Sequence, residues 1–246
     1  VAGFEITDRR DFYDLAIGNV PFGQYQVNDK AYNKLGFSIH NYFFAKALDQ
    51  VRPGGLVAFV TSRYTMDAKD PTVRRYLSQR AELLGAIRLP NNAFQANAGT
   101  DVVSDILFLQ RREQPIVTDE PWVHLGLSQN GIPINSYFVE HPEMVLGELT
   151  RESTQYGREE ATVRPLEGVS LADQLREAVQ HIQGNYQEAA LPDLGEGEAI
   201  DTSIPADPSV KNYSYTVVEG EVYYRENSRM VRPQLSTPAK ARVKAM

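Results

Sequence analysis

The stretch DLAIGNVPFG, which occupies residues 14–23, decides how the chain is expected to fold. Its first five residues are mostly apolar, which predicts a short buried β-strand over residues 14–18. Asn19, Pro21 and Gly23 follow at once, and these residue types favour a turn. Because ligands of open α/β sheets bind outside the carboxyl ends of the strands, a functional loop is expected at this turn.

The sequence around this stretch alternates apolar runs with amphipathic segments up to residue 112, which predicts a mostly parallel α/β sheet. Helices are expected over residues 38–51 and 71–82, with Ser38 and Asp70 as their N-caps. Further strands are expected at residues 56–61, 83–89 and 103–110. The last two strands are joined by a 13-residue loop, and loops of that length are commonly functional.

Four parts are expected along the chain. They are an α/β domain at residues 1–112, an α+β extension at 113–186, an acidic linker at 187–208, and a β-hairpin with a basic tail at 209–246. Within them, helical spacing of apolar residues predicts a helix over 170–183. Residues 213–218 and 221–224 flank Glu219-Gly220 and predict the hairpin.

The composition limits the chemistry that is available. The chain has 246 residues, a formal net charge of −7 and no cysteine, which excludes disulfides, thiolate metal sites and cysteine nucleophiles. The four histidines are scattered without metal-ligand spacing, so no metal site is expected. No apolar run approaches the roughly 20 residues that span a bilayer. We therefore expect a cytoplasmic protein without a membrane partner.

Positive charge gathers at the end of the chain. Residues 211–246 hold seven Lys or Arg against three Glu. Arg225, Arg229 and Arg232 could contact DNA phosphates, since charge neutralisation dominates non-specific DNA affinity. A solvated basic end explains the same composition.

The residues after the first strand suit the recognition of an amino group on a nucleobase. Such chemistry requires that the base leave the helix, stack on an aromatic side chain and be held at its polar edge. The Asn19 amide oxygen and the Val20 carbonyl could accept the two amino hydrogens, while Phe22 supplies the stacking face. Pro21 would fix the turn. A turn without function is the alternative, because Asn, Pro and Gly favour turns for local reasons.

The chain resembles the amino-group DNA methyltransferases that modify adenine, whose motif Asn/Asp-Pro-Pro-Tyr/Phe ends the fourth strand. Residues 12–18 look like the strand that leads into this motif, and residues 53–62 (PGGLVAFVTS) look like the next strand. Residues 84–94 and 105–110 are similar to the last two strands of type I modification subunits. The resemblance implies an α/β fold: the C-terminal half of a Rossmann-like S-adenosylmethionine-dependent methyltransferase sheet, followed by a looser α+β extension.

The same resemblance assigns the site. Asn19 and the Val20 carbonyl would bind the amino group of adenine, and Phe22 would stack on the flipped base. Val20 departs from the proline of most members, a change that a backbone contact should tolerate. The form Asn-Val-Pro-Phe-Gly resembles the methylase region of long helicase-methylase polypeptides of phages, plasmids and conjugative elements. The implied partners are DNA and the rest of such a polypeptide, including a helicase region.

The site for the methyl donor is expected to be incomplete. In this family S-adenosylmethionine is bound by a glycine-rich loop and an acidic residue, and neither is found in the 13 residues before Asp14. Phe4 matches an aromatic residue that meets the adenine of the cofactor, whereas Gly3 stands at the acidic position and Glu5 is only a substitute. Because the chain begins with Val1 rather than Met, we expect a piece of a longer protein that transfers no methyl groups by itself.

The sequence therefore predicts part of a DNA adenine methyltransferase. The alternative is a non-enzymatic module, derived from a methylase fold, that binds DNA or supports a neighbouring helicase region. Methylation of RNA or of protein glutamine uses the same Asn-x-Pro-aromatic arrangement and stays open.

Overall fold

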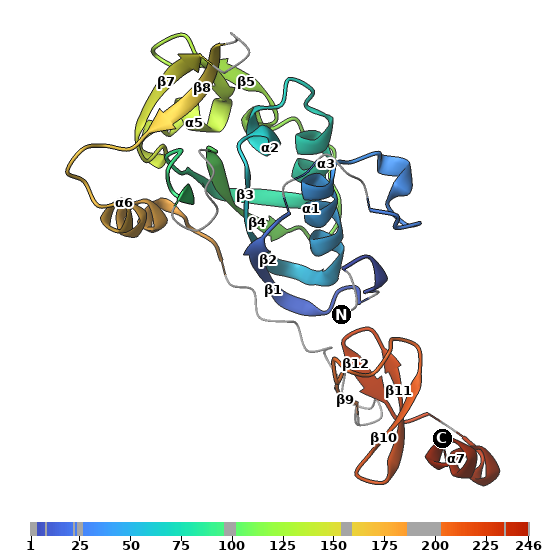
Figure 1. Ribbon diagram of the computed structural model, residues 1–246. Helices are drawn as coiled ribbons and strands as arrows, with labels where there is room; N and C mark the ends of the chain where they lie inside the picture. Colours follow the sequence, from blue (N-terminus) through green and yellow to red (C-terminus); the bar gives the residue numbers. More distant parts are fainter. Residues whose placement is uncertain are drawn as a thin grey trace.

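Four strands form the central sheet, in the order β1-β2-β4-β3 (Figure 1). They are β1 (Tyr13–Asn19), β2 (Val51–Ser62), β3 (Ala81–Arg88) and β4 (Ser104–Arg111). β1 pairs with β2 in parallel, and β4 runs antiparallel to both β2 and β3, so that three strands share one direction. The α/β class predicted from the sequence is confirmed. The structure is a computed structural model, and it describes residues 4–7, 9–21, 23, 27–95, 102–153, 159–185, 203–233 and 235–245.

Three helices accompany this sheet: α1 (Ile39–Gln50), the one-turn α2 (Tyr64–Asp67) and α3 (Thr72–Arg80). α1 packs on β2, and α3 packs on α1 and β3. Ser38 takes the N-cap position of α1 as predicted, although its side chain makes no capping hydrogen bond. The prediction of Asp70 as the N-cap of α3 is wrong by one residue, because Pro71 takes that position; the Asp70 carboxylate accepts a hydrogen bond from the Thr72 N–H (2.9 Å). α3 ends two residues earlier than predicted, because the next residues already pair with β4.

β1 differs from the buried strand that the sequence predicts. Its side chains Leu15 and Ile17 are 49% and 75% exposed. Within the described part of the chain, β1 pairs with β2 alone and so forms one edge of the sheet. A short apolar run indicates a strand, but it carries no information about what covers the two faces of that strand.

Gly55 lies in the part of β2 where the pairing with β1 is irregular. The pairing with β1 shifts its register between Tyr13 and Leu15. A Cβ atom at Gly55 would lie 2.8 Å from the Arg52 carbonyl oxygen and 3.1 Å from the Asp14 carbonyl oxygen. Glycine therefore leaves room for the path of β2 past Arg52 and for the close approach of β1 at Asp14.

Replacing Gly55 with alanine should destabilise the chain by about 1–3 kcal/mol, because the backbone must move to relieve the contact. Urea unfolding followed by the fluorescence of Trp122, the single tryptophan, measures this loss. Gly18→Ala is the matched control, since a Cβ there would meet only the Phe59 ring, at 4.0 Å. Equal stability of the two variants would contradict the expectation.

Shorter elements follow the sheet. They are β5 (Leu125–Leu127), β6 (Pro133–Asn135), α5 (Ser136–Glu140), β7 (Glu148–Ser153), β8 (Glu159–Arg164) and α6 (Leu171–Ala178). Short 3-10 helices lie at Phe4–Ile6, Asn33–Leu35, Pro121–Val123, Pro142–Met144 and Val179–His181. The pair β7–β8 sits against the end of β3, because the Leu146 N–H donates to the Arg88 carbonyl (2.9 Å) and the Asn91 N–H to the Val163 carbonyl (2.8 Å). The predicted helix over 170–183 is present as α6 with a 3-10 turn after it.

A second sheet, in the order β10-β11-β12-β9, forms a C-terminal module with α7 (Figure 1). Its elements are β9 (Ile204–Pro205), β10 (Tyr215–Val218), β11 (Glu221–Glu226), β12 (Arg229–Val231) and α7 (Thr237–Lys244). The predicted hairpin is confirmed, with φ of 49° at Glu219 and 81° at Gly220, as a type I′ turn requires. β9 lies inside the range predicted as acidic linker, and residues 187–202 lie outside the described residues. None of the helices that the structure describes has the length and apolar character needed to cross a membrane.

Candidate functional site

Asn19 lies at the carboxyl end of β1, in a row of residues that crosses the whole sheet. It faces Val60 of β2, which faces Ile106 of β4, which in turn faces Ile87 of β3. The chain stays tied to the sheet one residue further, because the Val20 N–H donates to the Val60 carbonyl (3.0 Å). The motif therefore starts at the edge where α/β sheets bind ligands.

The side chains of the motif divide between core and surface. Val20 is 2% exposed and packs in the main hydrophobic core, whereas Asn19 is exposed. Among the described residues the Asn19 amide has no hydrogen-bond partner, so its oxygen is accessible to a ligand. Pro21 is half-buried, and Phe22 lies outside the described residues. The valine thus anchors the turn through its side chain, while the asparagine beside it faces outward.

A hollow of about 430 Å³ lies beside β1. This volume falls within the range of about 300–1,000 Å³ that ligand pockets usually have. Its lining includes Asn19, Phe4 and Phe43. The rings of Phe4 and Phe43 are stacked, with centroids 4.7 Å apart and planes at 23°. The structure thereby places three of the residues predicted from the sequence, Asn19, Val20 and Phe4, in one lining.

Polar groups line the same hollow on the side of α1. Gln50 Nε2 donates to Thr7 Oγ1 (2.6 Å), and Thr7 Oγ1 donates to the Phe4 carbonyl (2.8 Å). These bonds hold the short helix that carries Phe4. Glu5 is placed differently: its side chain is exposed and outside this lining, and its carbonyl accepts a hydrogen bond from Lys46 Nζ (2.9 Å).

The chain after the motif folds over α1, and Asp29 anchors it there. Asp29 Oδ2 accepts hydrogen bonds from the Tyr42 hydroxyl (2.9 Å) and from Lys46 Nζ (2.7 Å). Burial acts to raise the pKa of Asp29, but the hydrogen bonds from Lys46 and Tyr42 outweigh it and hold this pKa below its usual value. Asp29 is therefore ionised at neutral pH.

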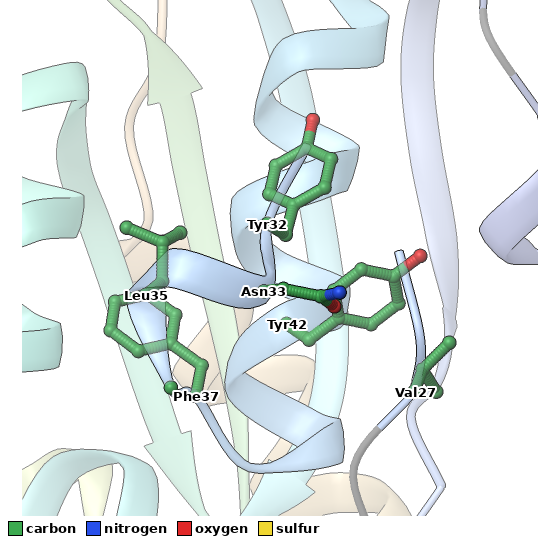
Figure 2. Close-up of a pocket in the computed structure, with 7 residues that line it drawn as sticks. Val27, Tyr32, Asn33, Leu35, Phe37 and Tyr42 are labelled. Atoms are coloured by element: carbon green, nitrogen blue, oxygen red, sulfur yellow. The ribbon is translucent and has the colours of Figure 1, made fainter. Parts of the chain in front are cut away.

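A small pocket lies between this segment and α1 (Figure 2). It is lined by Val27, Tyr32, Asn33, Leu35, Gly36, Phe37 and Tyr42. Its volume is about 70 Å³, well below the range of ligand pockets. The rings of Tyr32 and Tyr42 meet edge to face, with centroids 5.5 Å apart. We interpret this small pocket as part of the packing contact between residues 27–37 and α1.

Arg88 is buried at the carboxyl end of β3, and it connects residues at the same end of the sheet as Asn19. Its Nε and Nη2 each donate to one oxygen of Asp105 at 2.8 Å, and its Nη1 donates to Asp67 Oδ2 at 2.7 Å. Burial alone would lower the pKa of Arg88, but the charges of Asp105 and Asp67 raise it. The Asn135 N–H donates to Asp67 Oδ1 (3.0 Å), which extends the network to the end of β6. The network begins one residue beyond the row of Asn19.

Tyr64 is a residue at this edge that the sequence analysis missed. It follows the end of β2, and it is 49% exposed. The Arg63 guanidinium lies 4.3 Å from the centre of the Tyr64 ring. The Tyr64 hydroxyl donates a hydrogen bond to Glu160 Oε2 (3.1 Å). The signal in the sequence was an aromatic residue shortly after the carboxyl end of a predicted strand.

Arg225, predicted to contact DNA, is fully buried in the C-terminal module. Its Nε donates to the Asn227 carbonyl (2.9 Å) and its Nη1 to the Val210 carbonyl. Its guanidinium also lies 4.8 Å from the centre of the Phe12 ring, just before β1. The DNA contact predicted for Arg225 is therefore wrong in this fold, because its charge faces the interior and holds the module against Phe12.

The other two arginines of that prediction lie nearer the surface. Arg232 is exposed, and its Nε donates to the Tyr223 hydroxyl (3.1 Å). Arg229 is half-buried. Contacts of these two residues with DNA stay predictions.

Two further hollows, of about 320 Å³ and about 450 Å³, lie around the shorter elements after the sheet. The second reaches the beginning of β3 at Leu83 and Leu84 and includes His141 and His181. Neither lining includes a residue of the motif. In the described part of the chain, no group of three or more His, Asp or Glu side chains is placed to hold a metal ion.

No family model matches the sequence. The chain is 32% identical over 123 residues to the defense against restriction protein B of Escherichia phage P1, a match that covers 48% of this chain and 5% of that protein. The chain thus spans about a twentieth of the length of this relative.

Solved structures similar to the chain are methyltransferases and modification subunits of restriction enzymes. A putative class I S-adenosylmethionine-dependent methyltransferase from Listeria monocytogenes is 21% identical, with a TM-score of 0.36 and coverage of 48% of this chain and 36% of that one. A modification subunit of a putative type I restriction enzyme from Vibrio vulnificus is 18% identical, with a TM-score of 0.35 and coverage of 63% and 37%.

Proposed function

We propose that this chain carries the adenine-binding and catalytic part of an S-adenosylmethionine-dependent DNA adenine methyltransferase. The observation that carries the proposal is the placement of Asn19. Its exposed amide stands at the carboxyl end of β1, anchored by the buried Val20, beside the hollow that also contains Phe4. Among the described residues this amide has no other partner, so its oxygen is free to accept a hydrogen bond from a ligand in that hollow.

The residues suit the chemistry of amino-group methylation. S-adenosylmethionine, when bound, supplies a methyl group on a positively charged sulfur. Asn19 Oδ1 and the Val20 carbonyl would accept the two hydrogens of the adenine amino group and so direct the nitrogen lone pair. The same two oxygens would stabilise the positive charge that develops on the nitrogen, which is the kind of preorganised electrostatic help that matters most in enzymes. Phe22 would stack on the flipped base.

The hollow fits one side of a donor site. The stacked rings of Phe4 and Phe43 offer an aromatic face for the adenine of S-adenosylmethionine. Thr7 and Gln50 add polar groups to the same lining, as small-molecule pockets usually require. These residues would form one wall of the site, on the side of β1 that faces α1.

A role in modification of DNA against restriction is the biological setting that we favour. It is supported by the 32% identity to a phage protein whose name describes defence against restriction. DNA would then be the substrate, and the rest of a longer polypeptide would supply the remaining wall of the donor site.

The proposal is tested by mapping modified bases in cells that express the full-length protein. We expect methylated adenine at a fixed sequence in cellular DNA, and none in cells that express the Asn19→Ala variant. Methylation of RNA or of protein glutamine instead of DNA would overturn the choice of substrate. Absence of any methylated product, with S-adenosylmethionine present, would favour a module that only binds DNA.

A further inference from the structure

Lys46 is a buried charge in the middle of α1. Its side chain is only 5% exposed, and it stands on a helix that the sequence predicts to be largely apolar. A buried ammonium group is costly unless it is paired and hydrogen-bonded. The groups that contact Lys46 therefore explain how its buried charge is compensated.

The partners of Lys46 come from two segments that lie on opposite sides of the motif in the sequence. Its Nζ donates to the Glu5 carbonyl (2.9 Å) and to Asp29 Oδ2 (2.7 Å), and the Asp29 carboxylate is itself 10% exposed. The same ammonium lies 5.4 Å from the ring centre of Phe4 and 5.8 Å from that of Tyr32. Cations at such distances from aromatic faces are attracted to them.

We propose that Lys46 is a positioning residue that couples the donor side of the site to the base side. This inference rests on the proposed function, in which the donor side is the wall that contains Phe4 and the base side is the motif that starts at Asn19. The Glu5 peptide adjoins Phe4, whose ring lines the hollow beside Asn19. Asp29 anchors the segment that follows the motif.

The coupling follows from the charges. Of these partners only Asp29 carries a negative charge, and its pKa is held below the usual value by Lys46 and Tyr42 against the effect of burial. If the Asp29 segment moves away, the ammonium keeps only a carbonyl and aromatic rings, which do not compensate a buried charge. Lys46 must then move toward water. The Glu5 carbonyl loses its hydrogen bond from Lys46, and the Phe4 ring loses its contact with the ammonium group. Binding on one side thus stabilises the arrangement on the other.

The test uses the full-length protein with Lys46→Met, which removes the charge and keeps the length, and with Asp29→Asn, which keeps the shape. Lys34→Met is the matched control, because Lys34 is an exposed lysine of the same segment. Hydrogen exchange should become about tenfold faster in both segments, residues 4–7 and 27–35, as expected for the loss of one charged hydrogen bond. The control should leave both unchanged.

Methyl transfer supplies the second readout. In Lys46→Met we expect the KM for S-adenosylmethionine to rise about tenfold with kcat changed less than about threefold, because the positioned ring would touch the donor and not the reacting atoms. Lys46→Arg, which keeps the charge, should recover part of this loss. Faster exchange in only one segment, or an unchanged KM beside faster exchange in both, would overturn the inference.

The two proposals fail separately. If the wild-type protein transfers no methyl groups, the proposed function fails, and hydrogen exchange still decides whether Lys46 joins the two segments. If Lys46→Met unfolds the protein, Asp29→Asn carries the decision, since it disturbs the same pair without placing methionine in the helix.

Discussion

Replacing Asn19 with alanine should, under the proposed function, lower kcat for methyl transfer to adenine by about 10²–10³-fold in the full-length protein, the usual effect of removing one preorganised polar group from a transition state. The side chain is exposed at the end of β1 and has no other partner among the described residues, so its loss should leave the fold intact. Transfer of a labelled methyl group to DNA measures kcat. Affinity for DNA should change far less, because phosphate contacts dominate it.

Two further variants serve as a conservative substitution and as a control for this prediction. Asn19→Asp keeps an acceptor oxygen and should retain more activity than Asn19→Ala. Asn130→Ala removes an exposed asparagine from the turn between β5 and β6 and should leave kcat unchanged. If Asn19→Ala stayed within about threefold of wild type, the amide would not be part of a preorganised site.

Replacing Arg88 with methionine should destabilise the chain by about 3–5 kcal/mol, since removal of one partner leaves buried charges uncompensated. Arg88 holds Asp67 and Asp105 with three hydrogen bonds of 2.7–2.8 Å, and all three side chains are almost completely buried. Urea unfolding is again followed by Trp122. Its carbonyl accepts a hydrogen bond from Asn135 Nδ2 (2.8 Å), so it reports on the same region.

The effect of Arg88→Met should depend on pH in a defined direction. Burial raises the pKa of Asp105, while Arg88 acts to lower it, so loss of Arg88 raises this pKa further. A carboxyl group with a raised folded-state pKa is favoured in its protonated form, and the stability it contributes is lost as pH rises through that pKa. The difference in unfolding free energy between wild type and variant should therefore become smaller as the pH is lowered from neutrality.

Arg75→Met is the control for this pair of measurements. Arg75 is exposed, 3.9 Å from Asp119, and such surface pairs contribute about 0–1 kcal/mol. A loss of similar size in Arg75→Met and Arg88→Met, or a gap that stays constant with pH, would contradict the role assigned to the buried network.

The local pattern of the sequence predicts most of the fold, because it depends on neighbours in the chain. The helix after Ser38 follows from the helical spacing of its apolar residues, and the hairpin around Glu219-Gly220 follows from turn preferences; both act over a few residues. The border between α3 and β3 was placed two residues too late, since Ala81 and Glu82 have no local signal against helix and are drawn into pairing with β4.

The candidate site is only partly predictable from the sequence, because it depends on residues that are distant in the chain. Asn19 and Val20 stand out as a motif, but the packing of Val20 and the stacking of Phe4 on Phe43 depend on contacts between distant segments. Arg225 looks like one more charge in a basic tail. Its burial against Phe12 arises only when the two ends of the chain meet, and no local pattern records that meeting.

The edge position of β1 also has a consequence for the behaviour of the protein in solution. Among the described residues β1 is paired on one side only, so N–H and C=O groups along its other side have no strand partner there. Exposed apolar side chains such as Leu15 and Ile17 make such an edge a template for pairing with further strands. Residues 1–246 prepared alone are therefore expected to self-associate through this strand as their concentration rises. Among the described strands of the central sheet, the one that presents Asn19 is therefore also open to pairing along its free edge.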